Sequence, residues 1–576
     1  MYRRTLTYTC LLHLFILTLA DDTLVKTPLG PIRGLELTDE ETGKTVYEFR
    51  GIRFAKAPTG ERRFRKPEPV DPWAEEYDGT EYGYACPQMN FEEVDDGSSN
   101  QSEDCLFLNV YVPHSVTKGE KLSVMVWIHG GGLTLGNGFF YDGTRLAVDG
   151  NVIVVTINYR LGLLGFLGIH HSAARGNYGL WDQIAALQWV QHNIASFRGD
   201  PNSVTIFGES AGAWCVSFLT LIPSNKGLFT RAIAQSGVAA RYLSPGKREV
   251  QRFIQHVSEL TNCSLDNKND FIDCLRKTDV AVLLQAADQM QFVRENTLFV
   301  ESLFGPIVDG ELFPDNPMKL LEDQSSPQSQ FLSSLDFVAG TVSQEGSLLY
   351  MSIMPDLQEH YAFDAMVAIP AKFICGAIIS PFVDYYYKGD EKIKNAICSF
   401  YTSDGSEDDQ SNRAADFYGD MLFNPWTRNM LDYHARPGEG KTYQYQVSKL
   451  SPYPTGYPYM PPPSWFKGAG HFDEAIGLFR SNNRKAIFNG TISDDYKQYS
   501  RTMIAYWTSF AKTGVPCAGK TSLPWLEYDT KRRMFMEFDD EIYLRQNWKS
   551  AMNKFWSGEI PPVPIDEDLK ITHDEL

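Results

Sequence analysis

A serine flanked by glycines is the first feature of this sequence that suggests chemistry. Residues 208–212 read Gly-Glu-Ser-Ala-Gly, the G-x-S-x-G pattern of a serine exposed at a sharp turn between a strand and a helix. The β-branched run 204–207 before it and the apolar run 211–221 after it supply that strand and helix. Glycine is needed on both sides because so tight a turn leaves no room for Cβ atoms. We therefore expect Ser210 to be a nucleophile.

A glycine-rich loop upstream could supply hydrogen-bond donors for the same chemistry. The stretch 129–132, His-Gly-Gly-Gly, directly follows a buried apolar run at 124–128. Glycines allow backbone N–H groups to approach a developing oxyanion, and the N–H group of Ala211 would add another donor. We expect an oxyanion hole here, and we expect His129 itself to orient the loop.

A nucleophilic serine needs a base and an orienting acid, in the chain order serine, acid, histidine for this type of turn. The histidines after the serine are His256, His360, His434, His471 and His573. Only His471 lies in a glycine-rich setting, 468–471, that suits a loop over a cleft. For the acid, the apolar run 337–340 predicts a strand that leads to Glu345 on a loop. Spacing alone selects neither residue.

Short apolar runs alternate with longer helical ones along the chain. The runs 124–128 and 152–155 predict buried parallel strands, and 182–194 has helical spacing. Strand, helix, strand, helix is the order of a doubly wound α/β sheet. No internal repeat or long linker interrupts it, so we expect one catalytic domain over residues 21–560.

Both ends of the chain predict a route through the secretory pathway. Residues 1–20 combine Arg3 and Arg4 with a short apolar run and a small residue at the expected cleavage site, as in a signal peptide. The tail 561–576 ends in the HDEL form of the retrieval signal of the endoplasmic reticulum (ER), spelled by His573, Asp574, Glu575 and Leu576. We expect a protein of the ER lumen with the retrieval receptor as a partner. Three sequons predict glycosylated surface loops, at Asn100, Asn262 and Asn489.

The composition describes a large acidic globular chain. Of 576 residues, 43% are hydrophobic, and 53 Lys and Arg stand against 72 Asp and Glu for a formal charge of −19. This hydrophobic content excludes a disordered chain, and the lack of a basic block argues against nucleic acid or an anionic membrane as partner. Cleavage of the signal peptide removes two positive charges, which leaves −21.

Several other kinds of segment and site are missing from the sequence. The best internal candidate for a membrane span, 365–383, contains Pro370, Lys372 and Pro381, so we expect a buried or cleft-lining helix there. There is no H-E-x-x-H motif, and the Gly-Lys-Thr at 440–442 lacks the upstream glycine of a phosphate-binding loop. We therefore predict no membrane span, no metal site and no cofactor.

The whole mature chain resembles the carboxylesterase/cholinesterase (type-B) family of α/β-hydrolases. The matching motifs lie at 103–109, 129–132, 176–183, 208–212, 340–346 and 470–474. The resemblance implies an α/β-hydrolase fold, with a mostly parallel central sheet flanked by helices and with insertions that form a gorge over the active site. It also implies a nucleophile, an acid and a base, which are Ser210, Glu345 and His471. The implied oxyanion donors are the N–H groups of Gly131, Gly132 and Ala211.

These roles predict a serine carboxylesterase acting on a small ester. His471 would take the proton of Ser210 as it attacks the ester carbonyl, Glu345 would stabilise the imidazolium, and water would then hydrolyse the acyl-enzyme. The alternatives are a cholinesterase, a catalytically inactive adhesion member of the family, and a lumenal protein that only holds lipid in the cleft.

Two departures from the cholinesterase pattern weigh against the first alternative. The loop between Cys86 and Cys105 has no tryptophan, and Phe91 is its only aromatic residue, so a choline cation would lose its best cation–π partner. Leu133 replaces the aromatic residue that follows the glycines in cholinesterases, and Trp214 stands where the family often has a small or polar residue. Both changes predict a reshaped acyl pocket.

Eight cysteines remain after signal cleavage, in a compartment where disulfides persist. Proximity in the sequence suggests two pairs, Cys86–Cys105 and Cys263–Cys274. The family resemblance supports both and adds Cys398–Cys517. Cys215 and Cys375 would then be buried free thiols.

Overall fold

The computed structural model describes residues 23–561 except 40, 89–99, 115–118, 170, 242–246, 292–303, 349–363, 365–366, 403–404, 453–461 and 480–491. The signal peptide, the HDEL tail, Phe91 and the sequon at Asn489 thus lie outside the described residues. The other two sequon asparagines, Asn100 and Asn262, are exposed.

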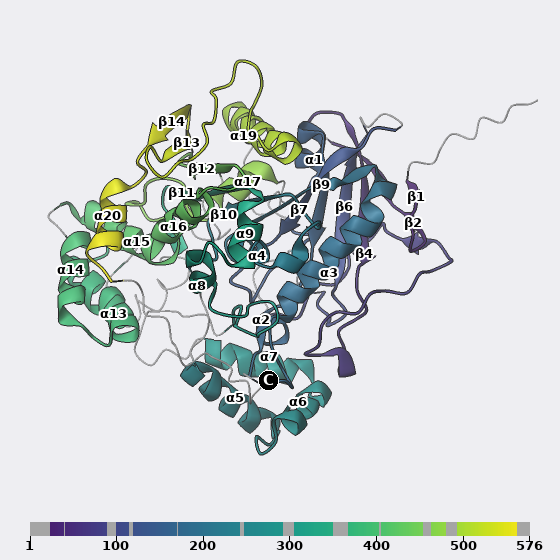
Figure 1. The fold of residues 1–576 in the computed structure, drawn as a ribbon, viewed down its shortest axis with the longest axis horizontal. Coiled ribbons are helices and arrows are strands. Elements are labelled where there is room, and N and C mark those ends of the chain that lie inside the picture. Colours follow the sequence, from purple (N-terminus) through teal and green to yellow (C-terminus); the bar gives the residue numbers. More distant parts are fainter. Residues whose placement is uncertain are drawn as a thin grey trace, which may run out of the picture.

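Within the described residues, one large sheet of 11 strands runs through the molecule (Figure 1). In spatial order its strands are β14 (Ile542–Gln546), β13 (Met534–Phe538), β12 (Thr442–Val447), β11 (Asp336–Val342), β10 (Arg231–Gln235), β9 (Gly199–Glu209), β7 (Leu122–Ile128), β8 (Ile153–Ile157), β6 (Phe107–Pro113), β4 (Thr45–Arg53) and β3 (Leu35–Thr38). Every pair from β8 to β13 is parallel, and the antiparallel pairs lie toward the two edges. The predicted fold class, a mostly parallel sheet with flanking helices, is confirmed.

A smaller sheet joins β1 (Leu24–Lys26), β2 (Pro31–Arg33) and β5 (Tyr77–Asp78). The helices that flank the large sheet are α1 (Thr144–Gly150), α3 (Tyr178–Asn193), α4 (Ala211–Leu219), α16 (Asn424–His434), α17 (Asp473–Leu478) and α19 (Asp494–Thr513). Shorter helices connect them, namely α2 (Gly162–Phe166), α8 (Pro317–Glu322) and α9 (Pro327–Ser333).

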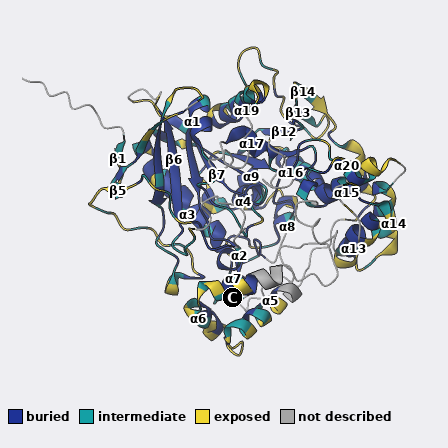
Figure 2. Cartoon of the chain, turned by 180° about the vertical axis from the view of Figure 1, so that it is seen from behind, coloured by how far each residue is buried: buried dark blue, intermediate teal, exposed yellow. Residues whose placement is uncertain are grey.

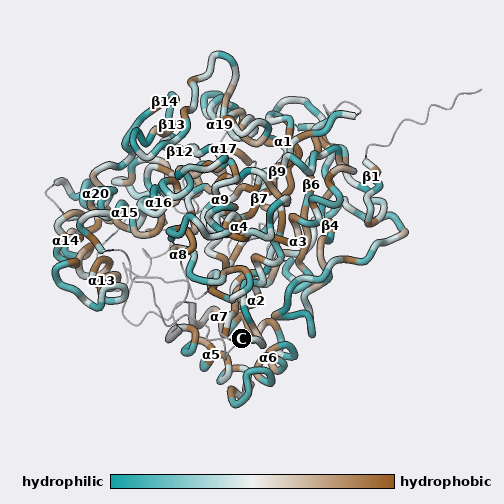
Figure 3. Tube along the Cα trace, in the orientation of Figure 1, coloured by the Kyte–Doolittle hydropathy of each residue, from teal (hydrophilic) through white to brown (hydrophobic). Residues whose placement is uncertain are grey.

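Strand β7 explains why the central strands read as unbroken apolar runs. Val124, Val126 and Ile128 pack into a core that they share with α3 and α4. Met125 and Trp127 point to the other face and pack with residues of α1 and α19. Because successive side chains of a strand point to opposite faces, a strand covered on both sides needs apolar residues at every position. The central strands are accordingly buried (Figure 2) and hydrophobic (Figure 3).

Two groups of helices lie beyond the edges of this layered core (Figure 1). The first contains α5 (Lys247–Thr261), α6 (Lys268–Lys277) and α7 (Val280–Gln291). The second contains α13 (Ser380–Tyr387), α14 (Glu391–Tyr401), α15 (Glu407–Leu422) and α20 (Ser550–Gly558), and it has an apolar core of its own.

The segment 365–383, the best candidate in the sequence for a membrane span, belongs to that second group of helices. Its helical part begins as α12 (Ala371–Phe373) after Pro370 and continues through the π-helical η4 (Ile374–Ile379) into α13. Most of its apolar side chains are buried against neighbouring helices. In the part of the chain that the structure describes, no helix is long and apolar enough to cross a membrane.

The structure corrects one of the expected disulfides. It contains Cys86–Cys105 and Cys263–Cys274, but the third bond joins Cys375 to Cys398. The predicted pair Cys398–Cys517 is therefore wrong, as is the prediction that Cys375 is a free thiol. Helices η4 and α14 pack together and bring the two Cα atoms to 5.5 Å, a separation that a disulfide spans. Cys517 is an exposed thiol after α19, and Cys215 is a buried one.

Candidate active site

Ser210 occupies the turn between β9 and α4, with φ 57° and ψ −126°, a conformation that is costly for a residue with a side chain. The neighbouring strand enforces this turn. A Cβ atom on Gly208 would lie 2.5 Å from the carbonyl oxygen of Ile128, and one on Gly212 would lie 2.0 Å from the same oxygen. From the other side, Ser210 N donates a hydrogen bond of 2.8 Å to the carbonyl oxygen of Gln235, at the end of β10.

The glycine loop packs directly on this turn. A Cβ atom on Gly130 would lie 2.7 Å from the carbonyl oxygen of Glu209. Gly131 and Gly132 both have positive φ, 103° and 61°. Among the described residues, no acceptor takes a hydrogen bond from the N–H groups of Gly131, Gly132 or Ala211. These three backbone donors thus have no acceptor in the part of the chain that the structure describes.

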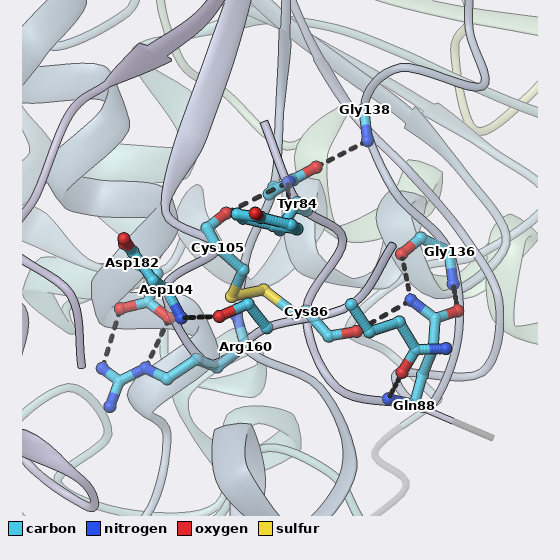
Figure 4. The surroundings of a disulfide bond; sticks show 12 residues. Tyr84, Cys86, Gln88, Asp104, Cys105, Gly136, Gly138, Arg160 and Asp182 are labelled. Atoms are coloured by element: carbon cyan, nitrogen blue, oxygen red, sulfur yellow. Dashed lines mark hydrogen bonds and ion pairs between the residues drawn. A yellow bond between two sulfur atoms is a disulfide. The ribbon is translucent and has the colours of Figure 1, made fainter. Parts of the chain in front are cut away.

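Gln88 ties the far end of this loop to the chain segment closed by the Cys86–Cys105 disulfide (Figure 4). Its Nε2 donates to the carbonyl oxygen of Gly136 (2.9 Å), and Gly136 N donates back to its Oε1 (2.8 Å). The same Nε2 also donates to the carbonyl oxygen of Cys86 (3.0 Å). Gly136 itself touches His129, since a Cβ atom there would lie 2.4 Å from His129 Nδ1. The disulfide loop therefore helps to position the glycine loop.

His129 has the surroundings of a structural residue. Its ring stacks on Tyr159 with 4.4 Å between ring centres, and the Tyr159 hydroxyl donates to the carbonyl oxygen of His129 (2.8 Å). Burial lowers the pKa of His129 to about 4, so the ring is neutral. These contacts agree with the expectation that His129 orients the loop.

His471 and Glu345, which lie on two loops far apart in the sequence, meet in the interior. His471 Nδ1 lies 2.6 Å from Glu345 Oε2, and both side chains are buried. The other carboxylate oxygen of Glu345 accepts a hydrogen bond from Val342 N (2.9 Å), and His471 N donates to Ser347 Oγ (2.8 Å). The loop that follows β11 therefore orients both the histidine ring and its backbone.

The second ring nitrogen of His471 faces Glu209, a residue that the sequence analysis did not single out. His471 Nε2 lies 3.1 Å from Glu209 Oε1. Ser210 follows Glu209 directly, yet within the described residues Ser210 Oγ takes part in no hydrogen bond. The structure thus joins Glu345 to His471 and places His471 beside the serine turn. Within the described residues it contains no hydrogen bond between Ser210 and His471. The only signal for Glu209 in the sequence is its place inside the G-x-S-x-G pattern.

Three buried carboxyl groups surround His471 and set its charge. Burial by itself would lower the pKa of His471, but Glu209, Glu345 and Glu474 outweigh burial and raise that pKa to about 9. Burial raises the pKa of Glu209 well above its usual range, and burial together with Glu345 raises the pKa of Glu474 to about 7. Because the pKa of His471 and the pKa of Glu209 are both raised, the charge of each group depends on the protonation of the other.

Aromatic side chains extend from the histidine to a narrow cavity. Phe423 lies 4.8 Å from the His471 ring, centre to centre, and Trp214 stacks on Phe423 at 5.9 Å. Trp214 and Leu133, the two departures from the cholinesterase pattern, both line a cavity that also touches Gly132. The cavity volume is about 10 Å³. Both residues are therefore placed to shape the space next to the glycine loop.

A larger cavity of about 480 Å³ lies elsewhere, near the first turn of α3 and α6. Its lining includes none of the predicted catalytic residues, and its charges form internal pairs such as Lys66 with Glu311 and Arg276 with Asp273. In the described part of the chain, no group of three or more His, Cys, Asp or Glu side chains is arranged to hold a metal ion.

Comparison with known proteins finds a matching family profile and several similar proteins. The profile described as the carboxylesterase family matches residues 21–556. The medium-chain "fatty acyl-CoA hydrolase precursor" of Anas platyrhynchos is 34% identical over 569 residues, covering 96% of this chain and 95% of that protein. Carboxylesterase 3B of Mus musculus is 32% identical, covering 96% and 94%, and carboxylesterase 3 of Homo sapiens is 32% identical, covering 93% and 90%.

The contacts of Gln88 generate a prediction about the glycine loop. We expect Gln88→Leu to lower the free energy of unfolding by about 1–3 kcal/mol, because the backbone N–H and C=O groups of Gly136 lose their partner. Amide exchange at residues 131–136 should also become faster, measured by hydrogen–deuterium exchange mass spectrometry. The matched control is Gln191→Leu, which removes hydrogen bonds to the carbonyl oxygens of Pro201 and Leu228. Equal exchange at 131–136 in both variants would contradict a positioning role for Gln88.

Proposed function

Because the chain belongs to the carboxylesterase family and is therefore a carboxylic-ester hydrolase, we propose that Ser210 is its nucleophile, His471 its base and Glu345 its orienting acid. The observation that carries the proposal is the buried contact of 2.6 Å between His471 Nδ1 and Glu345 Oε2, beside a serine on a strained turn. A neutral imidazole held in this way presents Nε2 toward the serine turn, as a general base requires.

The base must exchange one partner for another during the reaction. In the structure, His471 Nε2 faces Glu209, so substrate binding has to turn the ring or displace that carboxyl group before Nε2 accepts the Ser210 proton. Catalytic hydrogen bonds are often loose without substrate and tighten in the complex. His471 must also be neutral at that moment, because a protonated imidazole cannot accept the proton of Ser210.

The remaining steps follow from the open backbone donors. As Ser210 Oγ attacks the ester carbonyl, negative charge develops on its oxygen, and the N–H groups of Gly131, Gly132 and Ala211 would stabilise it. His471 then protonates the leaving alcohol, which leaves an acyl group on Ser210. Water attacks that acyl group by the same route, and Glu345 stabilises the imidazolium in both halves of the reaction.

The alternative functions account less well for the observations. An inactive adhesion protein has no need for a serine, a base and an acid in their family positions. A cholinesterase would bind its cation on a tryptophan in the loop between Cys86 and Cys105, and this loop has none. A protein that only holds lipid would not need open N–H donors at a strained serine.

We also propose that residues 21–560 form one catalytic domain and that the mature enzyme resides in the ER lumen. The large sheet takes strands from Leu35 to Gln546, which supports a single unit. The final four residues, His573 to Leu576, support retrieval.

Deletion of these four residues should release the enzyme into the medium of secreting cells, because the retrieval receptor would no longer bind it. Immunoblots of medium and cell lysate measure the distribution. A chain that ends instead in four alanines controls for length. If the intact chain already accumulates in the medium, the localisation proposal fails.

Ser210→Ala should lower kcat for simple neutral esters by about 10⁴-fold or more while the fold stays intact, because the attacking oxygen is gone. It should also abolish labelling by a fluorescent organophosphonate, which reacts only with an activated serine. Ser217→Ala on the same helix is the control, and it should lose the hydrogen bond that Ser217 Oγ accepts from Ala239 N but keep the label. Turnover that survives in purified Ser210→Ala would disprove the assignment.

The carboxyl cluster predicts a shifted pH profile for Glu209→Gln. Removing this charge makes the imidazolium of His471 less stable, so the pKa of His471 falls from its raised value of about 9. Because only neutral His471 acts as a base, the rising limb of kcat/KM against pH should move to lower pH. Asp200→Asn is the control, since it removes the same charge at the far end of β9, roughly 30 Å away. An identical rising limb in both variants would show that Glu209 does not control the base.

A further inference from the structure

We propose that Phe423 is a positioning residue for the base, whose ring packs on a face of the His471 imidazole and keeps its Nδ1 on Glu345. This inference deepens the proposed function and rests on it. The juxtaposition behind it is a buried phenylalanine, at the corner between α15 and α16, against the ring of the proposed base.

The two rings are close and nearly parallel. Their centres lie 4.8 Å apart, and their planes are inclined by 31°. This separation is within the range of packed aromatic pairs. Phe423 is 1% exposed and His471 is 3% exposed, so both rings are enclosed by the protein. The contact therefore belongs to the interior of the site.

The polar contacts of His471 leave one motion of its ring unrestricted. Nδ1 lies 2.6 Å from Glu345 Oε2, and Nε2 lies 3.1 Å from Glu209 Oε1. A ring that is held only at its two nitrogens can still tilt about the line that joins them. Packing on the face of the ring opposes this tilt. A flat aromatic face also lets the imidazole slide in its own plane, as the exchange of Glu209 for Ser210 requires.

The backbone holds Phe423 firmly at its corner. It is the single residue between the last residue of α15, Leu422, and the first residue of α16, Asn424. Phe423 N donates a hydrogen bond to the carbonyl oxygen of Gly419 (2.8 Å). Its own carbonyl oxygen accepts hydrogen bonds from Thr427 N and Thr427 Oγ1, both 2.9 Å long. Hydrogen bonds to both helices thus fix the direction in which the ring extends.

A buried polar network supports the same corner. The Asp420 carboxylate accepts hydrogen bonds from Asn424 Nδ2 (2.6 Å) and from the Tyr401 hydroxyl (2.6 Å). The Tyr401 hydroxyl in turn accepts a hydrogen bond from Trp556 Nε1 (2.8 Å). These contacts tie α15 to α16, α14 and α20, and buried networks of this kind make a structure rigid. The outer group of helices therefore supports the residue that packs on the base.

Helix α15 also packs on the loop of the proposed acid. A Cβ atom on Gly419 would lie 3.0 Å from Glu345 Cβ, and one on Gly346 would lie 1.6 Å from the carbonyl oxygen of Ala415. One end of one helix thus contacts Glu345 through Gly419 and reaches His471 through Phe423. Such an element is suited to keep the acid and the base in register.

Phe423→Leu tests the inference, because leucine keeps an apolar side chain at this position but lacks the flat ring. We expect kcat for 4-nitrophenyl acetate to fall by about tenfold or more, since a small misplacement of a catalytic group is costly. KM should change less than about twofold. Labelling by the fluorescent organophosphonate should slow by a similar factor but still reach completion, because Ser210 is present.

The pH profile gives a second readout. Burial lowers the pKa of His471, and three carboxyl groups that face its ring, of Glu209 at the end of β9, Glu345 after β11 and Glu474 on α17, raise it to about 9. A tilted imidazole loses part of its contact with Glu345, and its cationic form loses the face of the Phe423 ring. Both losses lower the pKa of His471. The rising limb of kcat/KM against pH should therefore move to lower pH, by about half a unit or more.

Phe417→Leu is the matched control for stability. Phe417 is a buried residue of the same helix, and its ring packs against Phe382 (5.6 Å) and Tyr401 (5.2 Å) in the outer group of helices. This variant should unfold at a lower temperature but keep the kcat, the KM and the rising limb of the wild type. If thermal unfolding shows that Phe423→Leu does not fold, Phe423→Met, with a flexible side chain of similar size, replaces it.

The inference is overturned if the folded Phe423 variant keeps the kcat or the rising limb of the wild type, or if its loss is confined to KM. It is also overturned if Phe417→Leu shows the same losses, because the effect would then follow stability alone. Failure of the Ser210 proposal gives a different result, since Ser210→Ala would then keep both its turnover and the label.

Discussion

The site depends on one backbone contact, the close approach of the serine turn to the end of β7. The carbonyl oxygen of Ile128 occupies the space where Cβ atoms on Gly208 and Gly212 would lie, so the chain passes this point only with glycine on both sides of Ser210. The strained φ of Ser210, the start of α4 and the docking of the glycine loop all follow from this contact. Strain of this kind persists only where the surrounding structure enforces it, and here β7 and β10 enforce it from both sides.

Buried charge is concentrated around this turn and is balanced in two ways. His471 lies among three carboxyl groups that raise its pKa, so they stabilise the protonated form of the ring. Among the described residues, Arg241, which follows the end of β10, contacts only neutral groups.

Parts of the molecule distant from the serine still position it. The Cys86–Cys105 loop reaches the glycine loop through Gln88, and the loop after β11 holds both the side chain and the backbone of His471. The outer helices have a different role, since α13 to α15 and α20 bury an apolar core of their own. Packing among those helices also decides the disulfide partner of Cys398, which a family resemblance assigned to the wrong cysteine.

Local rules let the sequence by itself predict the main strands, the serine turn and the family. An unbroken apolar run such as 124–128 predicts a strand buried on both faces, because both faces of such a strand are covered. Glycines at 208 and 212 predict a sharp turn, because such a turn leaves no room for Cβ atoms. Helix α3 begins earlier than the predicted 182, at Tyr178, because Gly176 and Asn177 adopt positive φ and turn the chain into it. Only the tertiary structure decided that Nε2 of His471 faces Glu209 and that Cys375 pairs with Cys398. Each of these depends on side chains brought together from distant segments, and no spacing along the chain encodes such distances.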